Sequence, residues 1–125
     1  LVTTSRRTGD AATQILMQAL PEDAFFHRWQ PEGDNPYASM LGAADAIVVT
    51  GESMSMLSEA CALGKPVFFF VPEGGVSAKH ARFHETLLSS GHARRLEADS
   101  HLAWQPSAPP DEAGRVAAAI LARLR

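Results

Sequence analysis

Residues 46–71 constrain the fold of this 125-residue chain more than any other segment. Ala46–Thr50 is a continuous run rich in β-branched residues, and Val67–Val71 is a second apolar run of strand length. Between them, a small-residue turn at Gly51-Glu52 leads into a helical pattern over residues 53–63. A continuous apolar strand is typical of a parallel sheet that is covered on both faces. The segment therefore predicts a strand–helix–strand unit with parallel strands.

The remainder of the chain repeats this alternation of strand-like and helical segments. The expected strands are Leu1–Thr4, Ala24–Trp29, Ala46–Thr50, Val67–Val71 and Ala93–Leu96, and the expected helices begin near Asp10, Asn35, Ser53, Lys79 and Asp111. Such alternation indicates a parallel sheet with helices on both faces. We therefore expect a single domain, residues 1–125, with a three-layer, Rossmann-like α/β fold and five parallel strands.

The two central strands and the helix between them supply the expected core. Ten side chains should be nearly fully buried: Ile47, Val48, Val49, Leu57, Ala60, Cys61, Val67, Phe68, Phe69 and Phe70. Cys61 is included because it lies in the middle of the helix on an apolar background, as a core cysteine does.

Composition limits the classes of protein to which the chain can belong. Hydrophobic residues make up 46% of it and charged residues 20%, as in a folded domain, and no apolar run is long enough for a transmembrane segment. The net charge of -3 argues against nucleic-acid binding. The single cysteine excludes an internal disulfide and favours a reducing compartment, which we take to be the cytoplasm.

The passage from the strand ending at Thr50 into the helix at Ser53 is the strongest candidate for a binding site. The first turn of a helix presents free N–H groups and the positive end of the helix dipole, to which Ser53 and Ser55 add hydroxyl donors. This combination suits a phosphate or diphosphate, and Glu59 can accept hydrogen bonds from a ribose diol. A second interpretation stays open, in which Ser53 is only a helix cap and Glu59 only a solvated helix residue.

Ser5-Arg6-Arg7-Thr8 follows the first expected strand and forms a second candidate. Ligands of open α/β sheets bind at the carboxyl ends of the strands, where two arginines can hold a phosphate or carboxylate. The alternative is a solvated turn whose arginines pair with Asp10 or with other acids.

Two further patterns carry less weight. His80 and His84 are four residues apart on one helix, but no third ligand is evident, so surface histidines, or a His84 packed against the strand ends, are favoured and no metal is expected. Gly51-Glu52-Ser53-Met54-Ser55 does not match the G-x-S-x-G motif of serine hydrolases. No catalytic residue is assigned.

Several motifs, in their order along the chain, resemble one known family. They are Thr4-Ser5-Arg6-Arg7-Thr8, Asn35-Pro36-Tyr37, Val49-Thr50-Gly51-Glu52-Ser53-Met54-Ser55-Met56, Ser58-Glu59-Ala60, Gly64-Lys65-Pro66-Val67, and Arg82-Phe83-His84 with Gly91 and Arg94. The family is named after a plant mitochondrial-fission factor, and its bacterial members are often labelled predicted nucleoside-diphosphate-sugar epimerases. Two residues depart from its pattern: Gly9 stands where proline is usual, and Glu52 where aspartate is common.

The family is in turn similar to the C-terminal, nucleotide-sugar-binding domain of GT-B glycosyltransferases. In that domain a small-residue turn and a helix N-terminus hold the diphosphate, and the glutamate of a Glu-Ala pair holds the ribose. The resemblance therefore implies a nucleoside diphosphate or nucleotide sugar as ligand, held by Gly51 to Ser55 and by Glu59. Together with the strand ends, the candidate binding residues are Ser5, Arg6, Arg7, Thr50, Gly51, Glu52, Ser53, Met54, Ser55 and Glu59.

The resemblance also implies a longer protein, of which this chain is a C-terminal fragment that is inactive alone. It adds an N-terminal domain on the acceptor side and an upstream central strand that is absent from this sequence. Without that strand, the expected order is 2-1-3-4-5, as in flavodoxin.

Three functions then compete. The chain is the nucleotide-sugar-binding domain of a glycosyltransferase-like protein, part of a GT-B-like epimerase, or a non-enzymatic family member that acts through protein contacts. The sequence has no dinucleotide-binding fingerprint, so we expect no cofactor.

Overall fold

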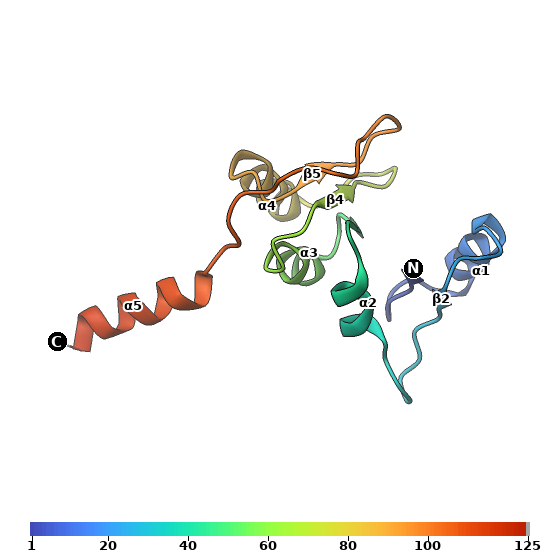
Figure 1. The fold of residues 1–125 in the computed structure, drawn as a ribbon, viewed down its shortest axis with the longest axis horizontal. Coiled ribbons are helices and arrows are strands. Elements are labelled where there is room, and N and C mark those ends of the chain that lie inside the picture. The colour runs from blue at the N-terminus through green and yellow to red at the C-terminus, as the bar shows by residue number, and fades with distance from the viewer. Residues whose placement is uncertain (125) are drawn as a thin grey trace. The chain divides into compact units, whose positions relative to one another are not determined.

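A computed structural model, which describes residues 1–124, divides the chain into two compact units. The first is Leu1–Ala44, and the second begins at Asp45. Strands and helices alternate throughout (Figure 1), so the expected α/β class with parallel strands is confirmed. That the two units belong to one domain stays a prediction.

The first unit contains two short parallel strands and two helices. Strand β1 (Val2–Thr3) pairs with β2 (Phe26–His27), and the helices are α1 (Asp10–Ala19) and α2 (Tyr37–Ala43). The chain enters α1 through Gly9, whose φ of 71° is in the left-handed region that favours glycine.

The second unit is a three-stranded parallel sheet with three helices. Its strands are β3 (Ile47–Thr50), β4 (Val67–Phe70) and β5 (Arg94–Arg95), in the order β3-β4-β5, and its helices are α3 (Met54–Cys61), α4 (Ala78–Ser89) and α5 (Glu112–Leu124). Because crossovers between parallel strands are almost always right-handed, two successive crossovers in the order β3-β4-β5 are expected to place α3 and α4 on the same face of this sheet.

Helix α3 ends at Cys61 rather than at the expected Leu63. The N–H groups of Leu63 and Gly64 bond to carbonyls three residues back, on Ala60 and Cys61, which tightens the last turn beyond α-helical geometry.

The strand pairings within each unit agree with the expected order. The neighbours β1-β2 and β3-β4-β5 are all parallel, with Ile47 opposite Val67 and Thr50 opposite Phe70. The pairing of β1 with β3 that would join them into one five-stranded sheet is not shown, so the full order 2-1-3-4-5 stays a prediction.

The expected core is confirmed at all but two positions. Side chains that are nearly fully buried include Ile47, Val49, Leu57, Ala60, Cys61, Val67, Phe68 and Phe69. The prediction was wrong for Val48, which is 49% exposed, and for Phe70, which is 42% exposed.

The two errors have one physical cause: the second face of this sheet is only partly covered. Val48 and Phe68 are register partners, as are Thr50 and Phe70, so all four project from the face opposite Val49 and Phe69. On that face Trp104 packs edge-on against Phe68, with ring centroids 6.3 Å apart, which accounts for the burial of Phe68. The continuous apolar strands predicted that both faces of the sheet are covered. Within this unit, however, the second face is covered only around Phe68.

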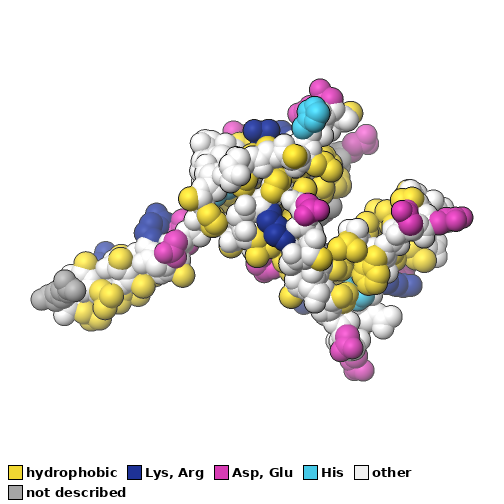
Figure 2. All heavy atoms as spheres, in the orientation of Figure 1, with side chains coloured by type: hydrophobic (Ala, Val, Ile, Leu, Met, Phe, Trp, Pro, Cys, Tyr) yellow, Lys and Arg dark blue, Asp and Glu magenta, His cyan; other side chains and the backbone are white. Residues whose placement is uncertain are grey.

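Helix α5 contributes no buried side chain. Its large apolar residues, Val116, Ile120, Leu121 and Leu124, are all more than half exposed, and apolar side chains gather along it in Figure 2. Among residues 1–124, no helix has both the length and the apolar character needed to cross a membrane.

Replacing Phe69 by alanine should lower the free energy of unfolding by about 3–5 kcal/mol, because the buried ring leaves a cavity. Phe70→Ala, on the same strand, is the matched control and should cost clearly less, because its ring is partly exposed. Denaturant melts measure both values. A loss below about 1 kcal/mol for Phe69→Ala would contradict this description of the core.

Candidate functional site

The turn between β3 and α3 is closed by backbone hydrogen bonds at both ends. The N–H of Ser53 donates to the carbonyl of Thr50 at 3.3 Å, which makes Thr50–Ser53 a β-turn. The N–H of Gly51 donates to the carbonyl of Phe70 at the end of β4, at 2.8 Å. The turn is therefore fixed to the carboxyl edge of the sheet, where ligands of such folds bind.

Gly51 is a glycine because another side chain approaches its backbone closely. A Cβ atom at this position would lie 2.9 Å from Cε1 of His84 and 3.0 Å from the carbonyl oxygen of Phe70. The ring of His84 also hydrogen-bonds the turn, with Nε2 at 2.7 Å from the carbonyl oxygen of Gly51. The small residue predicted in this turn thus has a packing reason.

Ser53 is the N-cap of α3, as one of the two interpretations expected. Its side-chain oxygen accepts a hydrogen bond from the N–H of Met56 at 3.4 Å, and the residue is buried. The cap uses one lone pair of the hydroxyl and leaves its hydrogen available as a donor. Capping and ligand binding by Ser53 are therefore compatible.

The first turn of α3 leaves backbone donors open. Met54 and Ser55 are the first two helical residues, and their N–H groups have no carbonyl one turn earlier within the helix. Ser55 and Glu59 are four residues apart and both exposed, so they share one face of α3. Within residues 1–124, the carboxylate of Glu59 has no hydrogen bond or ion pair.

In the first unit, the turn after β1 is closed by its own side chains. The N–H of Ser5 donates to Oγ1 of Thr8 at 2.9 Å, and the N–H of Arg7 donates to Oγ of Ser5 at 3.3 Å. Arg6 and Arg7 are exposed, and across residues 1–124 neither guanidinium has a hydrogen bond or ion pair. The alternative pairing with Asp10 is wrong, because Asp10 binds Arg28 at 2.6 Å.

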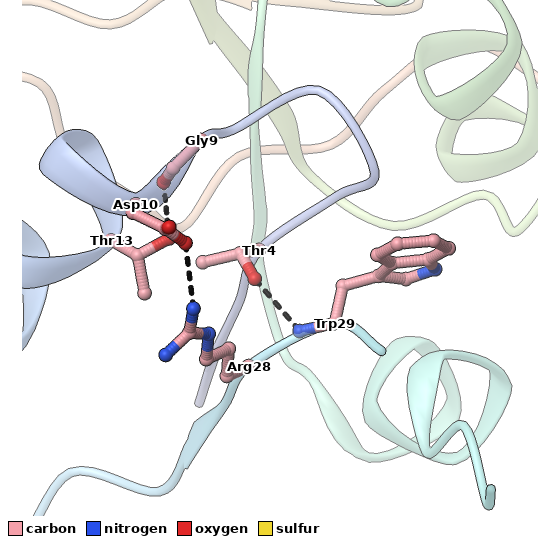
Figure 3. Close-up of polar contacts among 6 residues, drawn as sticks. All are labelled: Thr4, Gly9, Asp10, Thr13, Arg28 and Trp29. Carbon is pink, nitrogen blue, oxygen red and sulfur yellow. Dashed lines mark hydrogen bonds and ion pairs between the residues drawn. The ribbon is translucent and has the colours of Figure 1, made fainter. Parts of the chain in front are cut away.

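The backbone beside this turn is held by side-chain hydroxyls (Figure 3). Oγ1 of Thr4, which is buried, accepts from the N–H of Trp29 at 2.8 Å, and Oγ1 of Thr13 donates to the carbonyl of Gly9 at 2.6 Å. The turn holding Arg6 and Arg7 and the turn at Gly51 lie in different units. Whether they meet at one site stays a prediction.

The two histidines of α4 have separate structural partners. His84 is buried and stacks on Phe69 of β4 with ring centroids 4.4 Å apart, which confirms the expectation that it packs against the strands. His80 lies near the start of the helix, where its Nδ1 is 2.7 Å from Oγ of Ser77. In the part of the chain described, no three His, Cys, Asp or Glu residues form a group that could hold a metal ion.

A shallow hollow at the carboxyl ends of β4 and β5 was not predicted from the sequence. It encloses about 300 Å³ and is lined by Phe69, Phe70, Val71, Arg95, Leu96 and Glu97. Phe70 also accepts the hydrogen bond from Gly51, so the hollow adjoins the β3–α3 turn. The sequence signal that could have predicted the hollow is that part of its lining directly follows two neighbouring parallel strands.

Cys61 is a core residue of α3, as expected. Its thiol donates to the carbonyl of His92 at 3.6 Å, and burial raises its pKa from 9.0 to about 11. The thiolate, which is the reactive form, is therefore disfavoured.

Comparison with known proteins identifies one family. Residues 1–124 match the family model described as mitochondrial fission ELM1. The chain is 31% identical over 109 residues to the mitochondrial fission protein ELM1 of Arabidopsis thaliana, covering 87% of this chain and 25% of that protein. It is 34% identical over 124 residues to the uncharacterized protein RP120 of Rickettsia prowazekii (strain Madrid E), covering 97% of this chain and 35% of that protein. No solved structure matches the chain significantly.

The Cys61 thiol should react slowly with iodoacetamide at pH 8 in the native protein and rapidly after unfolding. Because its folded pKa is raised, the stability it contributes is complete below about pH 9 and is lost as the pH rises through about 11. Mass spectrometry measures the alkylation, with Cys61→Ala as the blank. Equal rates in the native and unfolded protein would show that the thiol is accessible.

Proposed function

The chain belongs to the mitochondrial fission ELM1 family, and from this premise we propose that it binds a nucleoside diphosphate, or the sugar ester of one, at the start of α3. It spans about a quarter and about a third of the lengths of the two curated relatives it matches. The proposal therefore concerns binding by this part of the protein, and the chemistry of the whole protein is a further proposal.

One observation carries this proposal, namely the fixed turn with open donors at the carboxyl edge of the sheet. Gly51 is held through its N–H by β4 and through its carbonyl by α4, and beyond it the N–H groups of Met54 and Ser55 lack partners within the helix. Donors that are fixed before a ligand arrives cost little ordering entropy when it binds. A diphosphate complements both these donors and the positive end of the helix dipole.

The spacing of Ser55 and Glu59 supports a nucleotide over a bare phosphate. The two residues are about one helical turn apart on the same face, a rise of about 6 Å along the axis. With the diphosphate at the N-terminal turn, the ribose extends along the helix to the exposed carboxylate of Glu59. Two acceptor oxygens suit a vicinal diol.

Two enzymatic roles use such a site. In the first, the chain is the nucleotide-sugar-binding domain of a glycosyltransferase-like protein, whose remaining length supplies the acceptor side. In the second, it is part of a GT-B-like epimerase. The shallow hollow beside Phe70, which carries the charged residues Arg95 and Glu97, offers space for a sugar next to the diphosphate in either role.

A non-enzymatic role in protein contacts is the second candidate function. The Arabidopsis relative is called a mitochondrial fission protein, and that name states a cellular process but no reaction. The exposed apolar residues of α5 favour this candidate, because a stripe containing Val116, Ile120 and Leu124 is costly to leave in water.

Glu59→Gln should weaken nucleotide binding about tenfold or more. The change keeps the shape of the side chain but removes its charge, and a charge-assisted hydrogen bond contributes about 1.5–3 kcal/mol. Calorimetric titration of the intact protein with the diphosphates of uridine, adenosine and guanosine measures the affinity. Glu22→Gln, the same charge change at an exposed site of the first unit, is the matched control and should bind normally.

The ribose contact has its own control within the same titrations. The 2′-deoxy diphosphates should bind the native protein more weakly than the ribose forms, and the two forms should bind Glu59→Gln about equally. Unchanged affinity in Glu59→Gln would show that Glu59 does not bind the ribose. Absence of binding by any diphosphate would favour the protein-contact function instead.

A further inference from the structure

His84 touches the turn of the proposed site from inside the protein. It lies in the middle of α4 and is 1% exposed, so no ligand at the surface contacts it directly. Its ring is held by the stack on Phe69, with an interplanar angle of 30°. From this position Nε2 reaches the carbonyl oxygen of Gly51 at 2.7 Å.

The direction of this hydrogen bond follows from the chemistry of its two atoms. A carbonyl oxygen only accepts, so Nε2 must carry a hydrogen and donate it. A buried carbonyl that loses its donor is costly, so the bond fixes where the oxygen of Gly51 points. The imidazole of His84 also packs tightly against Gly51, because a Cβ on Gly51 would lie 3.3 Å from Nε2 itself.

Fixing the carbonyl of Gly51 also fixes the N–H of Glu52. The two groups belong to one planar trans peptide, in which C=O and N–H point in opposite directions. Since the oxygen points toward buried His84, the N–H of Glu52 points away from α4, and Glu52 itself is exposed. Along residues 1–124 this N–H has no hydrogen-bond acceptor, like the neighbouring N–H groups of Met54 and Ser55.

The hydrogen bond from His84 opposes one alternative form of this turn. Gly51 and Glu52 are the two central residues of the Thr50–Ser53 turn, and neither has a positive φ, as in a type I turn. Turning over the central peptide of a type I turn gives the type II turn, in which φ of the second central residue, here Glu52, is positive. In that form the N–H of Glu52 faces the interior.

We propose that His84 is a positioning residue: through its Nε2–H bond to Gly51 it keeps the Gly51–Glu52 peptide turned so that the N–H of Glu52 joins those of Met54 and Ser55 in holding a diphosphate. The ligand part of this statement rests on the function proposed above. The turn part is a property of the free protein and is tested without ligand.

Two substitutions separate the hydrogen bond from the packing. His84→Phe keeps a ring on Phe69 but has no donor, and His84→Gln loses the ring but keeps an N–H donor at a similar reach. With the intact protein and uridine, adenosine and guanosine diphosphates as probes, His84→Phe should bind about fivefold more weakly and His84→Gln nearly normally. A role in packing alone predicts the reverse order, and that result would overturn the proposal.

Measurements on the free protein separate the failure of this proposal from the failure of the proposed function. In the native protein, the ¹⁵N spectrum of labelled histidine should show His84 with its hydrogen on Nε2, protected from solvent exchange. In His84→Phe, the backbone couplings of Glu52 should report a change in its φ, and the N–H of Glu52 should change its exchange rate. A hydrogen on Nδ1 alone, or an unchanged turn in a folded His84→Phe, would overturn the proposal whether or not a nucleotide binds.

Discussion

The geometry of the second unit depends on one buried hydrogen bond, between the imidazole of His84 and the carbonyl of Gly51. It joins α4 to the turn that leads from β3 into α3, while the ring that donates it packs on Phe69 in the middle of the sheet. Because a carbonyl this deeply buried needs a donor and a Cβ does not fit beside the ring, the contact accounts for both the histidine and the glycine. The turn that leads into the N–H groups at the start of α3 is thus held in place by a buried side chain, that of His84.

Much of this fold could be predicted from local patterns. The β-branched run ending at Thr50 and the Gly64-Lys65-Pro66 break marked β3, α3 and β4, because helix and strand signals there agree with each other. The cover of the second sheet face could not be predicted, since it depends on where a distant residue, Trp104, packs. The predicted burial of Val48 and Phe70 was wrong for that reason. Likewise, the pattern placed His84 against the strands, but the bond to Gly51 spans 33 residues and has no local signal.

The chain belongs to the mitochondrial fission ELM1 family and is similar to a protein of Arabidopsis thaliana and to one of Rickettsia prowazekii. The binding proposal rests instead on geometry: a fixed turn, unpaired helix N–H groups, and an exposed glutamate one turn along the same face. The exposed apolar side of α5 supports a role in protein contacts, and the two functions are compatible within one longer protein.

The most direct test of the account is a crystal structure of the intact protein with a bound nucleoside diphosphate. The account predicts phosphate oxygens within hydrogen-bonding distance of the N–H groups of Glu52, Met54 and Ser55, with the ribose diol facing Glu59 and His84 still bound to the carbonyl of Gly51. A nucleotide bound elsewhere, with the start of α3 left empty or covered by another segment, would contradict it.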